Sequence, residues 1–377
     1  MNSTNARSFG YRLIRMTLEH SFFEEKENFK QDERSAMMSK GYVDADGHIM
    51  EKAEELIKYL EEPWKSAEPV IPRRLLPTGD DFHTPRIRRK GIFNEAVGPE
   101  HWLEYLDKTG LEFTVLYPTA GLAHGYVINP EWAAVYARAW NNYVFEQYLK
   151  KSPQFKAVAV IPMQDVSAAV TELRRAVKEL GMVGAYIPSN GLRKHLSAQE
   201  FWPVYAEAEK LDCAIGIHGG WYSDLGFDTF TRFPGTRALG MPFPLAIAMT
   251  GMIQDGVWDA FPKLRVGFLE GGTSWIPLVI DRLEREREYG ELRCEKPILD
   301  YFSSGRFYVG CEGNESALSY VIERIGPQAC MFASDFPHEI PMEDALHEIN
   351  EILERKDIND KHKSMILGDN AKNFYKL

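Results

Sequence analysis

The chain has 377 residues, of which 44% are hydrophobic, enough for a large buried core. Its formal net charge of −11 argues against a nucleic-acid partner, which requires a basic surface. The four cysteines show no CxxC spacing, which favours free thiols in a reducing compartment. We find neither a run of about 18 apolar residues nor a signal peptide, so we expect a cytoplasmic protein without a membrane segment.

Residues 1–40 form a polar, charge-rich N-terminal extension with only scattered apolar positions. Such a segment is either a helix that docks on the rest of the chain or on a partner subunit, or a tail at the end of the domain. The first alternative predicts a homodimer or another homo-oligomer.

Residues 41–51 place three potential metal ligands at the end of a short strand of the buried type, namely Asp44, Asp46 and His48. Side chains two residues apart in a strand point to the same face, so Asp46 and His48 can reach one ion together. A carboxylate beside an imidazole suits zinc, iron or manganese. The structural alternative is a capped loop, because Asp and Gly both favour turns.

A long segment without clear periodicity, residues 63–98, follows the helix predicted for residues 52–60. A loop of this length within a compact domain is often a lid over a site. His83 and the nearby arginines would then meet an anionic substrate. The alternative is a solvated basic surface.

From residue 100 onward, helical and strand patterns alternate along the chain. Together with the opening strand, the predicted strands cover residues 41–46, 112–117, 156–162, 182–187, 213–218, 264–270, 306–311 and 329–334. The predicted helices that follow cover residues 100–109, 131–150, 165–180, 198–210, 245–260, 274–289, 315–324, 342–355 and 360–367. This alternation is typical of βαβ units and predicts an α/β fold, a (β/α)8 TIM barrel with long βα loops over residues 41–377. No strand is followed by the GxGxxG of a dinucleotide-binding fold.

Several predicted strands end in side chains that bind metals, and the strands of such a barrel end at one mouth. Besides the pair on the first strand, these side chains are His218, Glu270, Glu312 and Asp335, with His338 close behind. Each alone has a structural explanation, such as a satisfied polar residue, a helix cap or a salt bridge. Their convergence from separate strands predicts a metal site.

Five motifs resemble one known family. They are Asp44-x-Asp46-x-His48, His218-Gly-Gly, Glu270-Gly-Gly-x-x-Trp275, Ser334-Asp335-Phe-Pro-His338 and the closing Gly368-Asp-Asn-Ala-Lys-Asn-Phe-Tyr. Together they resemble the amidohydrolase superfamily, and most closely the amidohydrolase-related branch that includes aminocarboxymuconate semialdehyde decarboxylase. The resemblance implies a (β/α)8 barrel with one or two divalent metals at the strand ends. It also implies a hydrolase or decarboxylase that acts on a small carboxylated, lactone or aromatic substrate.

The sequence departs from the family pattern in its metal ligands. Asp46 and His48 stand where the usual pair is His-x-His, and Glu270 stands where hydrolases often have a histidine. No lysine that could be carbamylated ends the fourth strand. A site rich in carboxylates can hold two ions and shifts the preference from zinc towards iron or manganese. A dinuclear iron or iron–manganese oxygenase on the same barrel is therefore the alternative function.

The expected mechanism uses water activated by the metal. By the resemblance, Asp335 is a metal ligand and the base towards water or the proton shuttle, and His218 is a ligand or an electrophile. His338 is a ligand, a partner of the ligands or a proton donor, and Glu312 is a further ligand or a base. A scaffold protein with a decayed site is the non-enzymatic alternative.

Aromatic and basic residues of the loops are the candidates for substrate binding. We predict that Trp275 and Trp221 wall an apolar pocket, and that Arg232, with Arg237 in the same loop, pairs with a substrate carboxylate. The structural alternative for the aromatic residues is packing between loops.

Overall fold

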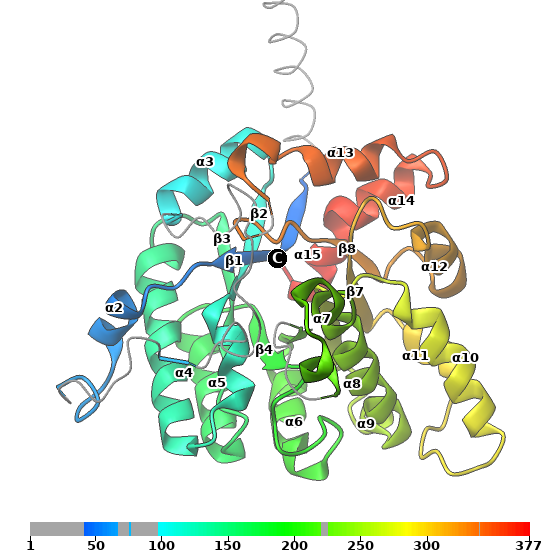
Figure 1. Ribbon diagram of the computed structural model, residues 1–377, viewed down its shortest axis with the longest axis horizontal. Coiled ribbons are helices and arrows are strands. Elements are labelled where there is room, and N and C mark those ends of the chain that lie inside the picture. Colours follow the sequence, from blue (N-terminus) through cyan, green and yellow to red (C-terminus); the bar gives the residue numbers. More distant parts are fainter. Residues whose placement is uncertain (1–40, 67–74, 77–96, 220–224, 339) are drawn as a thin grey trace, which may run out of the picture.

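The computed structural model describes residues 41–66, 75–76, 97–219, 225–338 and 340–377, and within them eight parallel strands form a barrel surrounded by helices (Figure 1). The extension predicted for residues 1–40 and most of the excursion predicted for residues 63–98 lie outside the described residues. Both therefore stay predictions.

The eight strands are β1 (Val43–Ile49), β2 (Phe113–Pro118), β3 (Phe155–Val160), β4 (Gly184–Pro188), β5 (Ala214–His218), β6 (Arg265–Leu269), β7 (Phe307–Cys311) and β8 (Cys330–Phe332). The longer helices are α3 (Pro99–Thr109), α4 (Pro130–Val144), α5 (Val166–Glu179), α6 (Trp202–Leu211), α7 (Phe233–Gly240), α8 (Pro242–Gln254), α10 (Trp275–Arg287), α12 (Leu318–Ile325) and α13 (His347–Glu354). Shorter helical segments are α2 (Ala53–Leu56), η1 (Ile57–Tyr59), η3 (Ala120–Tyr126), η4 (Phe145–Leu149), η5 (Gln199–Phe201), η6 (Phe227–Thr229), α9 (Val257–Ala260), α11 (Ile298–Phe302), η7 (Met342–Asp344), α14 (Asp360–Ser364), η8 (Met365–Asp369) and α15 (Asn370–Tyr375).

Each strand pairs in parallel with the next strand of the chain, from β1 through to β8. All eight strands are buried along their whole length or all but one residue, which explains the mainly apolar sequences of β2 to β8. The predicted (β/α)8 TIM barrel is confirmed.

The barrel closes between β1 and the residues that follow β8. The backbone N–H of His48 donates to the carbonyl of Phe336 at 2.8 Å, and the N–H of Asp335 donates to the carbonyl of Asp46 at 3.0 Å. The buried Asp44 carboxylate adds side-chain bonds, because it accepts from the Thr114 and Ser334 hydroxyls, both at 2.8 Å. Asp44 thus joins β1, β2 and the exit of β8 and is a structural residue of the closing seam.

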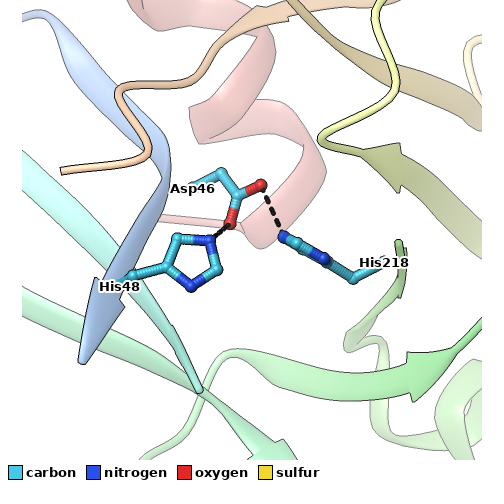
Figure 2. Close-up of side chains that lie close together, drawn as sticks. All are labelled: Asp46, His48 and His218. Carbon is cyan, nitrogen blue, oxygen red and sulfur yellow. Dashed lines mark ion pairs between the residues drawn. The ribbon is translucent and has the colours of Figure 1, made fainter. Parts of the chain in front are cut away.

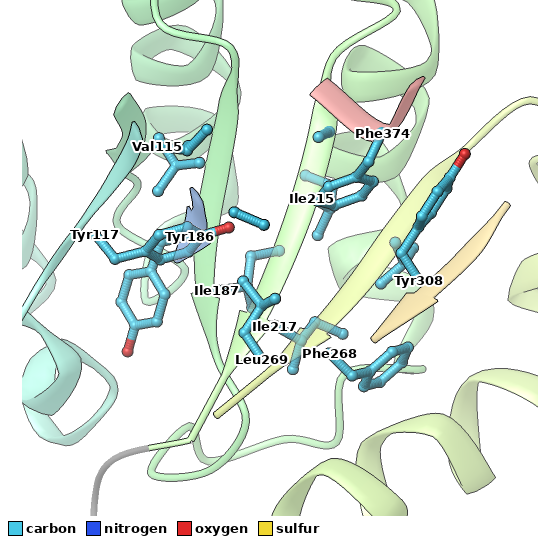
Figure 3. Close-up of a cluster of buried hydrophobic side chains, with 14 of the residues drawn as sticks. Val115, Tyr117, Tyr186, Ile187, Ile215, Ile217, Phe268, Leu269, Tyr308 and Phe374 are labelled. Atoms are coloured by element: carbon cyan, nitrogen blue, oxygen red, sulfur yellow. The ribbon is translucent and has the colours of Figure 1, made fainter. Parts of the chain in front are cut away.

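Apolar side chains from several strands fill the barrel interior (Figure 3). The ring of Phe374, from the C-terminal α15, lies 4.8 Å from the ring of Tyr308 and beside Gly267, where a Cβ atom would come within 2.7 Å of it. Gly216 likewise leaves room for the ring of Tyr117. Glycines that face large aromatic rings thus let side chains pack the interior of the barrel.

The segment between β5 and α8 differs from the prediction. The sequence analysis predicts no helix between the strand that ends at residue 218 and the helix that begins at residue 245, but the structure has α7 over Phe233–Gly240. Pro234 and Gly235 suggest a loop, yet proline is well tolerated in the first turn of a helix, where the missing N–H has no helical partner. The helix predicted for residues 245–260 is divided into α8 and α9 by Gly256, which has a φ of 75°.

Within the described residues, no helix combines the length and the apolar character that crossing a membrane requires. The cytoplasmic location expected from the sequence stays a prediction.

Replacing Ser334 by Ala is expected to lower the free energy of unfolding by about 2 kcal/mol, because it removes a hydrogen bond to Asp44 and the acceptor of the Phe336 N–H. Burial raises the pKa of the Asp44 carboxyl to about 6, against the hydrogen bonds from Thr114 and Ser334. The hydrogen bond that is lost is stronger when the Asp44 carboxylate is ionised. The decrease in the free energy of unfolding, measured with urea, is therefore expected to be larger at pH 8 than at pH 5.

Ser304→Ala is the matched control for this prediction. Ser304 also donates one hydrogen bond, to the Tyr301 carbonyl at 2.7 Å, and accepts one, from the Arg306 N–H at 3.2 Å, but it is exposed. The control is expected to lose less than about 0.5 kcal/mol at either pH. Equal losses in the two variants would contradict a special role for the seam.

Candidate metal centre

Asp46, His48 and His218 form a buried cluster at the ends of β1 and β5. Figure 2 shows the Asp46 carboxylate between the two imidazoles. Its Oδ2 lies 3.1 Å from His218 Nε2, and its Oδ1 lies 3.5 Å from His48 Nε2. Asp46 and His48 both face the barrel interior, as their spacing in the sequence predicted.

Glu270 and His338 extend this cluster. Glu270 Oε2 lies 3.5 Å from His218 Nε2 and 4.0 Å from His48 Nε2. The rings of His338 and His48 meet edge to face with their centroids 4.2 Å apart. His48, Glu270 and His338 can also bring one ligand atom each to within 4.8 Å of one another. Because both groups share His48, the five side chains make one centre.

Backbone carbonyls set the orientation of two imidazoles. Nδ1 of His48 lies 3.0 Å from the carbonyl oxygen of Pro118, and Nδ1 of His218 lies 2.6 Å from that of Gly219. A carbonyl only accepts, so both rings carry a proton on Nδ1 and turn Nε2 towards the centre.

The resulting donor set fits a divalent cation. Nε2 of each of these rings and both oxygens of Asp46 are buried and have no hydrogen-bond partner among the described residues. They face one another across the centre instead. A buried polar atom without a hydrogen-bond partner lowers the stability of the fold unless it binds an ion. Carboxylate and imidazole groups together are a common ligand set for divalent metals.

Burial and neighbouring charges shift the pKa values of the histidines in different directions. For His48, burial first and then His338 and His218 hold the pKa well below its usual value. For His338, burial, His218 and Arg237 lower the pKa to about 3. Burial also acts to lower the pKa of His218, but Asp46 and then Glu270 outweigh it and raise the pKa to about 9. Without a metal, His218 is therefore expected to carry a second proton on Nε2, and a bound cation would replace that proton.

Two of the predicted site residues have a strained backbone. Glu270 has a φ of 57° and Asp335 has a φ of 50°, in the left-handed region that non-glycine residues seldom adopt. Glu270 follows directly on β6, and Asp335 lies three residues beyond the end of β8. Such strain, on the order of 1 kcal/mol or more, is often retained at functional sites.

Other predicted site residues lie elsewhere. Glu312 is exposed and belongs to neither ligand group, so its role as a ligand stays a prediction. Trp275 is buried against Phe268, with its Nε1 donating to the carbonyl of Gly272, which is a packing position. Arg232 is exposed at the start of α7, and Trp221 lies outside the described residues.

The carbonyls of Pro118 and Gly219 were missed by the sequence analysis. Main-chain acceptors leave no side-chain signal, because any residue supplies a carbonyl. The only available sign was position, since both residues end or follow a strand that reaches the site.

Comparison with known proteins places this site in a family. A family model described as amidohydrolase matches residues 43–377. The chain belongs to the amidohydrolase family. The resemblance stated from the motifs is thereby confirmed, and the match begins at the first residue of β1.

Relatives of this amidohydrolase include 2-amino-3-carboxymuconate-6-semialdehyde decarboxylase of Dictyostelium discoideum, which is 28% identical over 76% of this chain and 79% of the relative. Gamma-resorcylate decarboxylase of Polaromonas sp. is 26% identical over 72% of this chain and 85% of the relative. A solved dihydroxybenzoic acid decarboxylase from Polaromonas sp., with bound manganese and the inhibitor 2-nitroresorcinol, superposes with a TM-score of 0.66 at 22% identity, over 89% of this chain and 97% of that one. That structural likeness shows the shared barrel.

The predicted enzyme class, an amidohydrolase-related hydrolase or decarboxylase, is confirmed by these matches. The chain is therefore an enzyme. None of the three relatives named above is an oxygenase, so the oxygenase alternative has no support from them.

Replacing Asp46 by Asn is expected to weaken metal binding by more than about 100-fold, because it removes the carboxylate that lies nearest to both imidazoles, 3.1 Å from His218 Nε2 and 3.5 Å from His48 Nε2. Metal content per chain is measured by elemental analysis after loading and desalting. Asp344→Asn, which neutralises an exposed aspartate of η7 outside both ligand groups, is the matched control and is expected to keep its metal. A variant at Asp46 that retains the metal would contradict the site.

Proposed function

We propose that this enzyme is a metal-dependent decarboxylase that releases CO₂ from a small aromatic or unsaturated carboxylate. The observation that carries the proposal is the buried centre of Asp46, His48 and His218, in which backbone carbonyls direct both imidazole Nε2 atoms towards one carboxylate. The decarboxylase relatives support this choice of reaction over hydrolysis.

Asp46, His48, His218 and Glu270 would hold one divalent ion, with His338 beside them. We propose manganese, since carboxylate and imidazole ligands suit it and the dihydroxybenzoic acid decarboxylase was solved with manganese bound. When bound, the ion supplies positive charge that attracts substrate oxygens and stabilises negative charge developing on them.

Decarboxylation breaks the bond between the carboxylate and the carbon that bears it, and that carbon must take up a proton as CO₂ leaves. We assign this proton to the Asp335 carboxyl group. The N–H of Asp335 bonds the Asp46 carbonyl and its own carbonyl accepts from the His338 N–H, both at 3.0 Å, so its side chain starts beside the ligands. Arg237 of α7, which acts on the pKa of His338, and Arg232 of the same helix are candidates to pair with the substrate carboxylate.

The proposal is tested by loading the enzyme with Mn²⁺ and measuring CO₂ release from 2,6-dihydroxybenzoate, 5-carboxyvanillate and 2-amino-3-carboxymuconate 6-semialdehyde, in air and under argon. We expect CO₂ release from at least one of these substrates, at the same rate in both atmospheres.

Asp335→Asn is expected to lower kcat by about 10²- to 10⁴-fold with the metal retained, because the proton donor is lost. Asp344→Asn, an exposed aspartate in η7, is the control. Full activity of Asp335→Asn would remove Asp335 from the mechanism.

We also propose that the chain forms a homodimer through a groove between α8 and α10. The groove measures about 780 Å³ and carries four exposed large apolar side chains, Phe243, Ile247, Leu278 and Tyr289. Arg282 and Glu286 line it as well. In a two-fold symmetric dimer the same surface of each subunit contacts its copy. The apolar side chains would then pack against each other, and Arg282 of one subunit could pair with the acidic residue of the other, so the surface is complementary to itself.

Leu278→Glu is expected to give monomers of about 43 kDa by sedimentation, because it places a charge in the apolar groove. Tyr320→Glu on α12 is the control, since Tyr320 is 53% exposed and Leu278 is 54% exposed. Arg282→Glu and Glu286→Arg are each expected to weaken the dimer, and the double exchange to restore it. A wild-type monomer at micromolar concentration would exclude the dimer.

A further inference from the structure

Glu51 lies two residues beyond β1 and accepts hydrogen bonds from one short loop. Its carboxylate accepts from the backbone N–H groups of Thr119 at 3.1 Å, Ala120 at 2.8 Å and Gly121 at 3.3 Å. The indole Nε1 of the buried Trp140 donates to the same carboxylate at 2.8 Å. The acidic group therefore holds the first turn of η3 from a distance of about 70 residues along the chain.

This loop carries the acceptor that orients a metal ligand. Pro118, whose carbonyl oxygen lies 3.0 Å from Nδ1 of His48, directly precedes the three residues that Glu51 holds. The Thr119 hydroxyl lies 3.4 Å from the same nitrogen. A carbonyl only accepts, whereas a hydroxyl can also donate. The loop position therefore decides which nitrogen of His48 carries the proton.

We propose that Glu51 is a positioning residue of the metal centre: it holds residues 118–121 so that the Pro118 carbonyl keeps the proton of His48 on Nδ1 and leaves Nε2 free to bind the ion. Glu51 acts through His48 and does not itself belong to either ligand group. The inference rests on the metal centre of the proposed function.

The N–H groups at the start of η3 explain why the side chain at position 51 is a carboxylate. The first N–H groups of a helical turn have no partner within the turn, and a negative charge is stabilised there. Both oxygens of Glu51 accept, Oε1 from Gly121 and Trp140 and Oε2 from Ala120, with Thr119 shared between them. A glutamine would turn an NH₂ group towards at least one of these donors, and the loop would move away.

The experiment compares wild type, Glu51→Gln and Trp140→Phe. The Phe variant removes one donor to Glu51 from the core and leaves the bonds to the loop in place, so it controls for a loss of stability alone. Metal affinity is measured by competition of Mn²⁺ with a chelator. The tautomer of His48 is measured in metal-free protein by ¹⁵N NMR of labelled histidine, with His48→Gln assigning the signal.

For Glu51→Gln we expect a metal affinity about 10- to 100-fold weaker and a loss of the Nδ1–H form of His48. For Trp140→Phe we expect an affinity within about threefold of wild type and the Nδ1–H form retained. Glu51→Asp, which keeps the charge but shortens the side chain, is measured as well and is expected to weaken binding by a smaller factor than Glu51→Gln. It serves as the test if the Gln variant does not fold.

Wild-type affinity and an unchanged tautomer in Glu51→Gln would overturn the inference, and so would an equal loss in Trp140→Phe. A failure of the metal centre itself has a different signature, because the wild-type protein would then bind no Mn²⁺. The two outcomes are therefore distinguishable.

Discussion

Three polar side chains of β1, those of Asp44, Asp46 and His48, have no exposed surface, and the surrounding structure has to satisfy them. Burying a carboxylate or an imidazole without partners costs several kcal/mol, on the order of 2–7 kcal/mol for a neutral polar group. Asp44 meets this requirement with hydroxyl and N–H donors from β2 and the exit of β8. The Asp46 carboxylate and Nε2 of His48 instead face each other, His218 and Glu270 across the barrel, while Nδ1 of His48 bonds the Pro118 carbonyl. The same strand thus closes the fold and begins the metal centre.

The chemistry of the centre depends on how rigidly the imidazoles are held. Carbonyls at the exits of β2 and β5 keep the protons of His48 and His218 on Nδ1, so both Nε2 atoms point to one place before any ligand arrives. Glu270, which has a strained backbone at the exit of β6, brings its Oε2 to 3.5 Å from His218 Nε2. An ion would therefore find its ligands already placed, which limits the cost of ordering them.

A carboxylate-rich centre on an amidohydrolase barrel is consistent with decarboxylation. The candidate ligands that depart from the His-x-His pattern, Asp46 and Glu270, would bring negative charge to a bound ion, and such charge lowers the preference for zinc and weakens the attraction of a substrate anion. Arg237 of α7, whose positive charge lowers the pKa of His338, offsets part of this charge. Substrate choice then belongs to the loops after the strands, which differ most among enzymes on this fold.

The sequence by itself determined the barrel and the cluster of candidate metal ligands at its mouth. The predicted strands agree with the observed ones to within a few residues, because buried parallel strands are continuous apolar runs ended by glycine, proline or polar residues. Asp46, His48, His218 and Glu270 were predictable because each ends such a run. Only the tertiary structure decided that Trp275 packs in the core, that Glu312 stays outside both ligand groups, and that α7 replaces a loop. It also decided the links from Glu51 to residues 119–121 and from His48 to Pro118, since hydrogen bonds to backbone groups about 70 residues away depend on where the chain lies and not on which side chains it carries.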